Sequence, residues 1–246
     1  MSEMIKIIAY NIEYAKSATP AAIAGHLKPA NPDIICFSEV PQGDWTAEVG
    51  QKLGMNYCYV GNVASANHLK EYPDQTGQFY GKFKSILSKT PLTEPYELLL
   101  NGSGWQPASV VMAHTVIHGL PLLIGSLHIP TGVKAPSQSC AADLAKQLKA
   151  DQDANIIISG DYNDLANAAA LQYLYRTGFS TAWQESGFEL QEVKTCNAKS
   201  EEDVGVIDHI LYRGRLQAVN SGIIKSAPPL SDHYAIWAEI LLNPKA

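Results

Sequence analysis

Short apolar segments recur along the whole chain, separated by polar and turn-forming residues. Several of them are continuous rather than alternating, for example Ile34–Phe37 and Ile156–Ile158. Continuous runs of this length are typical of central strands that are covered on both faces. The predicted strands are Ile5–Tyr10, Asp33–Phe37, Tyr57–Val60, Ser85–Ser88, Val110–Ile117, Leu122–His128, Asn155–Ser159, Val206–Tyr212, Ala218–Ile224 and Tyr234–Leu241.

Fewer segments have the spacing of an amphipathic helix. Between Ala141 and Leu148, apolar residues recur at three- and four-residue spacing, which places them on one helix face. Thr19 followed by Pro20 is typical of a helix N-cap with proline at the first helical position. The predicted helices are 20–29, Thr46–Leu53, Ala141–Leu148 and Ala168–Tyr175.

This inventory predicts an α/β architecture. About ten strands of the buried type and about four helices imply two β-sheets packed together and covered on the outside by helices. The chain has 246 residues and contains no internal repeat, low-complexity segment or recognisable linker. We therefore expect residues 1–246 to form a single domain.

Charge and composition exclude some classes of protein. Charged residues make up 17% of the chain, the formal net charge is −6, and the arginines are Arg176, Arg213 and Arg215. A histone-like or tail-type nucleic-acid binder, which depends on many contacts between cations and phosphates, is excluded. An enzyme that holds phosphate through a metal ion is not.

The cysteines and the N-terminal segment indicate the compartment. No pair of cysteines has CxxC spacing, so we expect free thiols, although a disulfide between Cys36 and Cys58 stays open. No signal peptide precedes the first predicted strand, and no apolar run reaches the length of a membrane span. We therefore expect a cytoplasmic protein without a membrane span, and a monomer, unless a leader was removed.

Polar residues stand at the ends of several buried-type strands. Ionisable groups avoid burial unless they are paired or bound to a metal ion, so their recurrence at strand ends predicts a site. Carboxylate and amide oxygens are the ligands that Mg²⁺, Mn²⁺ or Ca²⁺ requires. The residues concerned are Asn11, Glu39, His128, Asp161, Asn163, Asp208, Asp232 and His233.

Spacing adds orientation to this set. Asp161 and Asn163 are two residues apart, so both side chains would point the same way from an extended chain. Asp208 and His209 are adjacent in a predicted strand, so they must face opposite sides. Only one member of that pair can therefore face a shared site.

The same segments resemble a known family. Ala9-Tyr10-Asn11-Ile12, Phe37-Ser38-Glu39-Val40, Ser159-Gly160-Asp161-Tyr162-Asn163-Asp164, Val206-Ile207-Asp208-His209-Ile210-Leu211 and Leu230-Ser231-Asp232-His233-Tyr234 are similar to motifs of the endonuclease/exonuclease/phosphatase superfamily, of the deoxyribonuclease I-like and exonuclease III-like type. Gly125-Ser126-Leu127-His128 fits the same order, and the likeness runs from residue 5 to about residue 241. The resemblance implies a four-layer α/β/β/α sandwich of two mixed sheets.

The resemblance also implies roles. Members cleave phosphate esters with Mg²⁺ or Mn²⁺. Carried over, Glu39 would be the principal metal ligand, supported by Asn11 and Asp232. The implied catalytic residues are Asp161 and Asn163 for the attacking water and the phosphate, His233 as general base or as the group that neutralises phosphoryl oxygens, Asp208 to orient His233, and His128 to bind phosphate and protonate the leaving oxygen.

The chain departs from the family pattern around the predicted substrate contacts. Lys84-Ser85-Ile86-Leu87-Ser88-Lys89 stands where members often have Asn-Ala-Ile-Leu-Ser-Arg, and Val206 stands where an arginine is common. The substrate-binding residues are therefore unknown. Lys82, Lys84 and Lys89 are candidates for a phosphate-facing patch, and a solvated strand is the favoured alternative.

Several functions fit these residues. The first is a metal-dependent phosphodiesterase or nuclease that acts on DNA or RNA. The second is a phosphatase or phosphodiesterase for a small phosphorylated molecule or a lipid headgroup of the inositol-phosphate or sphingomyelin type. The third, a non-catalytic binding protein, is disfavoured because every expected polar residue is present. The sequence distinguishes poorly between the first two.

Overall fold

The computed structural model describes residues 3–64, 82–102, 107–130, 136–151, 154–185, 189–190, 193–200 and 205–242. The α-helices are α1 (Pro20–Leu27), α2 (Trp45–Leu53), α4 (Pro136–Gln147) and α5 (Ala169–Arg176). The strands are β1 (Glu3–Asn11), β2 (Ile34–Val40), β3 (Tyr57–Val60), β4 (Phe83–Ser88), β5 (Thr93–Leu100), β6 (Ala108–Ile117), β7 (Leu120–His128), β8 (Ile156–Asp161), β9 (Ser180–Thr181), β10 (Asp208–Arg213), β11 (Leu216–Ile224) and β12 (Ala235–Leu242).

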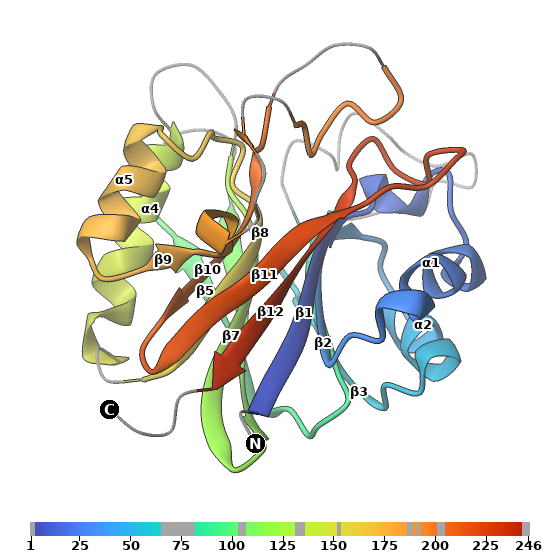
Figure 1. The fold of residues 1–246 in the computed structure, drawn as a ribbon, viewed down its shortest axis with the longest axis horizontal. Helices are drawn as coiled ribbons and strands as arrows, with labels where there is room; N and C mark the ends of the chain where they lie inside the picture. Colours follow the sequence, from blue (N-terminus) through green and yellow to red (C-terminus); the bar gives the residue numbers. More distant parts are fainter. Residues whose placement is uncertain are drawn as a thin grey trace.

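The strands form two mixed six-stranded sheets that pack face to face. The first has the order β11-β12-β1-β2-β4-β3, and the second has the order β5-β6-β7-β8-β10-β9. Figure 1 shows α1 and α2 outside the first sheet and α4 and α5 outside the second. The predicted four-layer sandwich is therefore confirmed.

Strand β1 explains why the apolar runs are continuous. Ile7 and Ala9 lie in the apolar core between the two sheets. Ile8 and Tyr10 point the opposite way, into the core between the first sheet and its helices. Both faces of the strand are thus buried, and burial of each large apolar side chain stabilises the fold by about 1.5–3 kcal/mol.

The predicted helices are all present, but one long strand was missed. β5 is largely exposed at the edge of its sheet and contains Pro95, so it lacks the apolar run that marks the other strands. Cys36 and Cys58 are both free, so the disulfide left open by the sequence does not form. Among the residues that the structure describes, no helix is long and apolar enough to cross a membrane.

Each sheet contains one parallel pair of strands, and these pairs position the site. β1 pairs with β2 in the first sheet, and β7 pairs with β8 in the second. A parallel connection needs a crossover, which α1 and α4 supply. Parallel strands end at the same edge of a sheet, so the ends of all four strands come together at one end of the sandwich, the upper end in Figure 1.

Gly160 allows β8 to approach β7 closely at this end. Its φ is +143°, and a Cβ added there would lie 2.1 Å from the carbonyl oxygen of Leu127. In the next register position, His128 pairs with Asp161. The glycine of the Gly-Asp motif therefore sets how near those two side chains come.

We predict that Gly160→Ala destabilises the protein by about 3 kcal/mol, because the new Cβ would push against backbone rather than a movable side chain. The matched control is Gly25→Ala, since Gly25 is exposed in α1 and its added Cβ would meet nothing within 4 Å. There the change should stabilise by up to about 1 kcal/mol. Urea unfolding of both variants checks this, and equal midpoints would contradict it.

Candidate active site

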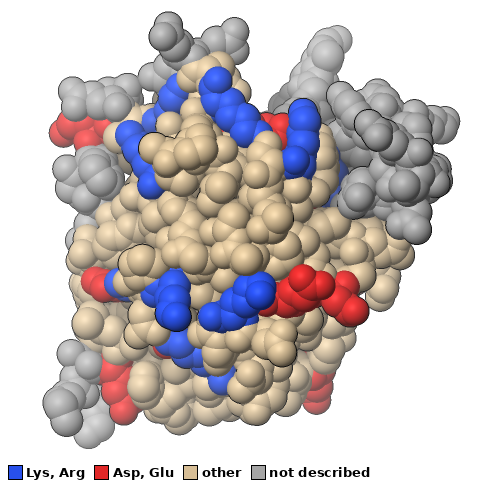
Figure 2. Space-filling model, turned by 90° about the vertical axis from the view of Figure 1, so that its right-hand side faces the viewer, with Lys and Arg blue, Asp and Glu red and all other residues tan. Residues whose placement is uncertain are grey.

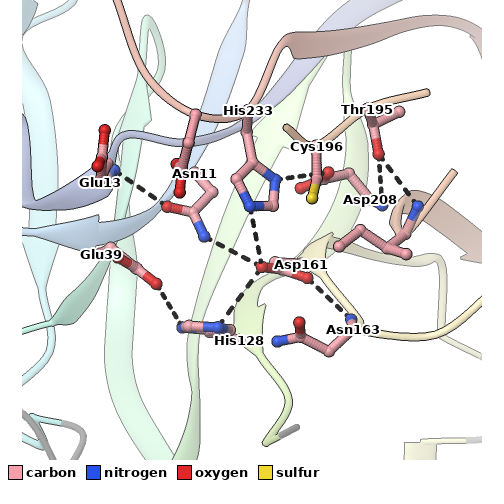
Figure 3. Close-up of polar contacts among 12 residues, drawn as sticks. Asn11, Glu13, Glu39, His128, Asp161, Asn163, Thr195, Cys196, Asp208 and His233 are labelled. Carbon is pink, nitrogen blue, oxygen red and sulfur yellow. Dashed lines mark hydrogen bonds and ion pairs between the residues drawn. The ribbon is translucent and has the colours of Figure 1, made fainter. Parts of the chain in front are cut away.

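The predicted polar residues gather where the two sheets meet. Asn11 ends β1, His128 ends β7 and Asp161 ends β8, while Asp208 begins β10. Glu39 is the next-to-last residue of β2, and His233 lies just before β12. Figure 3 shows these side chains converging, although they come from segments far apart in the sequence. All of them are at least nine-tenths buried.

Asp161 lies at the centre of the cluster. Its Oδ2 accepts a hydrogen bond of 3.0 Å from Asn11 Nδ2, across the two sheets. The same oxygen lies 3.5 Å from His128 Nε2 and 3.6 Å from His233 Nε2. Burial, reinforced by the nearby Asp208 charge, raises the pKa of the Asp161 carboxyl despite the attraction of His233.

His233 and Asp208 form a buried pair. His233 Nδ1 and Asp208 Oδ2 are 2.8 Å apart, so Nδ1 carries the proton and Nε2 faces Asp161. Burial by itself lowers the pKa of His233, but the charges of Asp208 and Asp161 outweigh it and raise the pKa to about 10. The two carboxylates thus favour the charged imidazolium form of the ring.

Thr195 supports this pair, and sequence reasoning missed it. Its Oγ1 accepts hydrogen bonds from the backbone nitrogens of Ile207 and Asp208 at 3.0 and 3.1 Å. Its carbonyl oxygen accepts from the nitrogen of Tyr234 at 2.8 Å. One buried threonine thus ties the strand that carries Asp208 to the segment that carries His233. No apolar pattern surrounds Thr195, so nothing in the local sequence indicates its role.

Glu39 reaches the cluster through an irregularity in its strand. The pairing of β2 with β4 shifts between Ser38 and Val40, and Glu39 has a φ of +57°. Such a bulge redirects one side chain. Glu39 Oε1 lies 2.6 Å from Lys82 Nζ and 3.7 Å from His128 Nδ1. Burial raises the pKa of the Glu39 carboxyl, and the Lys82 ammonium opposes this rise.

A second irregularity follows Asn11. Glu13, Tyr14 and Ala15 all have positive φ, between +47° and +59°, and none of them is glycine. Each such residue costs roughly 1–2 kcal/mol, and strain of this kind is concentrated at functional sites. The nitrogen of Glu13 donates to Asn11 Oδ1 at 3.1 Å, so the turn fixes the amide that reaches Asp161.

Asn163 corrects one expectation. The spacing of Asp161 and Asn163 predicts an extended chain with both side chains on one side, but β8 ends at Asp161 and Asn163 has a φ of +51°. The chain turns because the nitrogen of Asn163 donates to Asp161 Oδ1 at 2.8 Å. The Asn163 side chain instead donates to the carbonyl oxygen of Ile129 at 2.8 Å, beside His128.

The remaining candidates divide between the cluster and the rest of the fold. Asp232 is partly buried and near enough to raise the pKa of Glu39. Lys84 is wholly buried and donates to the carbonyl oxygen of Val63, so it is not on a solvated strand face. Lys89 pairs with Asp33 at the opposite end of β4. His209 faces away from Asp208, as expected, and bonds the carbonyl oxygen of Asp164.

The donor set suits a hard divalent cation. Glu39, Asp161, Asp232 and Asn11 offer carboxylate and amide oxygens, which Mg²⁺ and Mn²⁺ prefer. Asp208 Oδ1 is buried and has no hydrogen-bond partner among the described residues. Potential ligand atoms of Asp161, Asp208 and His233 lie within 4.8 Å of one another. His233 Nδ1 and Asp208 Oδ2 already bond each other, whereas Glu39 lies on the other side of His128.

A profile of the endonuclease/exonuclease/phosphatase family matches residues 8–233. The chain belongs to this family. Endonuclease/exonuclease/phosphatase enzymes are hydrolases that act on phosphate esters and generally use divalent metal ions. No curated protein sequence matches the chain at a significant level.

Solved structures share the family's fold with this chain. An endonuclease/exonuclease/phosphatase from Beutenbergia cavernae has a TM-score of 0.80 and 14% identity, covering 98% of this chain and 72% of its own. A mannosyl-6-phosphatase from Bacteroides thetaiotaomicron has a TM-score of 0.74 and 15% identity, covering 96% and 99%. D. rerio TDP2 complexed with a single-strand DNA product has a TM-score of 0.70 and 16% identity, covering 97% and 99%.

We predict that Asp208→Asn lowers the pKa of His233 from about 10 towards its ordinary value near 6.5, because the main charge that favours the imidazolium is lost. NMR titration of the imidazole signals in EDTA measures this. Asp33→Asn, at the far end of the strands, removes the same charge and serves as the control. An unchanged His233 titration in Asp208→Asn would show that Asp208 does not set the charge of the ring.

We predict that Thr195→Val destabilises the protein by about 1–3 kcal/mol, because the buried nitrogens of Ile207 and Asp208 lose their acceptor. His233 should also titrate at a lower pH once Asp208 is less well held. Thr195→Ser keeps the hydroxyl and should restore both properties. If valine and serine behave alike in unfolding and in titration, the hydroxyl does not position the pair.

Proposed function

We propose that this chain is a divalent-metal-dependent hydrolase of phosphate esters, and that its substrate is a phosphodiester in nucleic acid. The observation that carries the proposal is the buried charge arrangement around Asp161. One oxygen of that carboxylate is shared by the Nε2 atoms of two histidines, and one of the histidines is held by a further carboxylate. Glu39 completes the site on the other side of His128.

The chemistry requires positive charge at an anionic substrate. A bound divalent cation would be held by Glu39 with Asn11 and Asp232, and would supply Lewis-acid stabilisation of phosphoryl oxygens. The His233 imidazolium adds a second positive group, because Asp208 fixes its Nδ1 proton and leaves Nε2–H free to donate to a phosphoryl oxygen. Of the two roles implied for His233, the raised pKa favours this one over general base.

Asp161 is then the group that holds the attacking water. The pKa of this carboxyl is raised towards neutral pH, which makes the carboxylate a stronger base and suits a group that accepts a proton from water. The nitrogens of His128 and His233 on either side restrict where that water can lie. His128 would bind the phosphate and protonate the leaving oxygen, and Asn163, beside it, would contact the phosphate.

The substrate class rests on the surface and on the relatives. Figure 2 shows the side of the molecule with α1 and α2, where basic side chains, with acidic side chains beside them, form an upper group and a middle group separated by uncharged surface. The upper group lies at the same end as the site, where a phosphate backbone could run. Similarity to TDP2 with a single-strand DNA product supports nucleic acid. Similarity to a mannosyl-6-phosphatase supports the second candidate, a phosphatase for a small phosphorylated molecule.

We predict hydrolysis of at least one member of a substrate panel in Mg²⁺ or Mn²⁺, and none in EDTA. The panel comprises plasmid, single-stranded DNA, abasic duplex, RNA, bis-p-nitrophenyl phosphate, sugar and inositol phosphates, and sphingomyelin. Glu39→Gln and His233→Gln should each lower kcat by about 100-fold or more. The first weakens the binding of the cation and the second removes the imidazolium, so each takes positive charge away from the reacting phosphate.

His114→Ala is the matched control, because His114 is a partly exposed histidine on β6 and should not affect turnover. Cleavage of polynucleotides supports the nucleic-acid proposal. Cleavage of sugar or inositol phosphates alone would replace it with the second candidate. Full activity in Glu39→Gln and His233→Gln would refute the site, and turnover that persists in EDTA would refute the metal dependence.

A further inference from the structure

The Lys82 ammonium lies on the carboxylate that the proposed function assigns to the metal ion. Lys82 Nζ is 2.6 Å from Glu39 Oε1, and both side chains are about nine-tenths buried. A lysine is rarely buried to this extent unless it is paired. This contact is therefore a defined feature of the site and differs from a surface ion pair.

The position of this ammonium is built by the fold on two sides. Lys82 directly precedes Phe83, which pairs with Val40 next to the irregularity that redirects Glu39. On the other side the ammonium lies 4.5 Å from the centre of the Tyr14 ring, a distance at which the ring face attracts a cation. Tyr14 is held in the left-handed turn after Asn11. The bulge in β2 therefore positions Glu39, and the left-handed turn after Asn11 positions the ring that contacts Lys82.

The ammonium and a divalent cation would compete for the Glu39 carboxylate. A divalent cation binds a carboxylate oxygen at about 2.0–2.6 Å, and Nζ lies 2.6 Å from Glu39 Oε1, so a cation bound to this carboxylate would lie close to the ammonium. His128 Nδ1 already stands 3.7 Å from this oxygen on another side. Two cations on one carboxylate oxygen repel each other, and in a buried site water screens that repulsion little.

We propose that Lys82 is a built-in competitor of the divalent cation for Glu39, and that metal binding displaces its ammonium. The inference rests on the proposed metal-dependent function. In the metal-free protein the ammonium offsets the charge of Glu39 among the other carboxylates of the site. The affinity for metal is then weaker than these carboxylates alone would give, and a neutral residue at position 82 makes it stronger.

Calorimetric titration with Mn²⁺ alone tests the proposal without any assay of activity. Lys82→Met should bind Mn²⁺ at least about tenfold more tightly than the natural chain, as expected for the loss of one adjacent competing charge. Lys82→Arg keeps the charge and should stay near the natural affinity. Lys89→Met is the matched control, because Lys82 directly precedes β4 whereas Lys89 directly follows it and pairs with Asp33 at the far end of that strand.

A second measurement follows the lysine signals of the unmodified chain and uses a variant only to assign them. In protein labelled with ¹³C at lysine Cε, Mg²⁺ should shift the Lys82 signal, which is assigned by its absence in Lys82→Arg, and should leave the Lys89 signal in place. Equal Mn²⁺ affinity in Lys82→Met and Lys89→Met, or a Lys82 signal unmoved by saturating Mg²⁺, would overturn the competition. If no variant binds Mn²⁺ at all, the proposed metal-dependent function fails as well.

Discussion

The hydrogen bond from Asn11 to Asp161 joins the two sheets at the point where the site forms. Asn11 belongs to the first sheet and Asp161 to the second, and both are buried. An unpaired carboxylate at this depth would be costly, so the two sheets are held in one relative position by the need to satisfy it. The other polar groups of the site take their places around this contact. His128 and His233 approach the same carboxylate oxygen, and Asp208 and Thr195 stand behind His233.

The buried carboxylates of the site need positive groups beside them. Glu39, Asp161, Asp208 and Asp232 are all at or near the cluster, and burial raises the pKa of Glu39 and of Asp161. Two positive groups offset these carboxylates, the imidazolium of His233 and the ammonium of Lys82. An enzyme that accepts a phosphate ester must add a negative group to this balance, which is why an added divalent cation suits the site. The acidic net charge of the whole chain, −6, therefore does not argue against a phosphate substrate.

Sequence reasoning found most of the fold because the strands are buried on both faces. Their apolar runs end abruptly at polar residues, so Asn11, His128 and Asp161 were visible as exceptions. Glu39 was visible in the same way, but its orientation was not, because a positive φ at a glutamate follows from strand pairing and not from residue type. Lys82 and Thr195 lie outside the apolar runs, and their partners are distant in sequence, so only the folded chain shows their contacts. The edge strand β5 was missed because an exposed strand needs no apolar run.

Each sheet supplies half of the site, and this division has a mechanical consequence. Asn11 and Glu39 move with the first sheet, whereas His128, Asp161 and Asp208 move with the second. The distances between these polar side chains therefore depend on how the two sheets pack against each other. The apolar layer between the sheets includes Ile7 and Ile124, and the size of its side chains sets the distance between the two sheets. In the proposed function, the geometry of the site would therefore depend on apolar residues that lie outside the site itself.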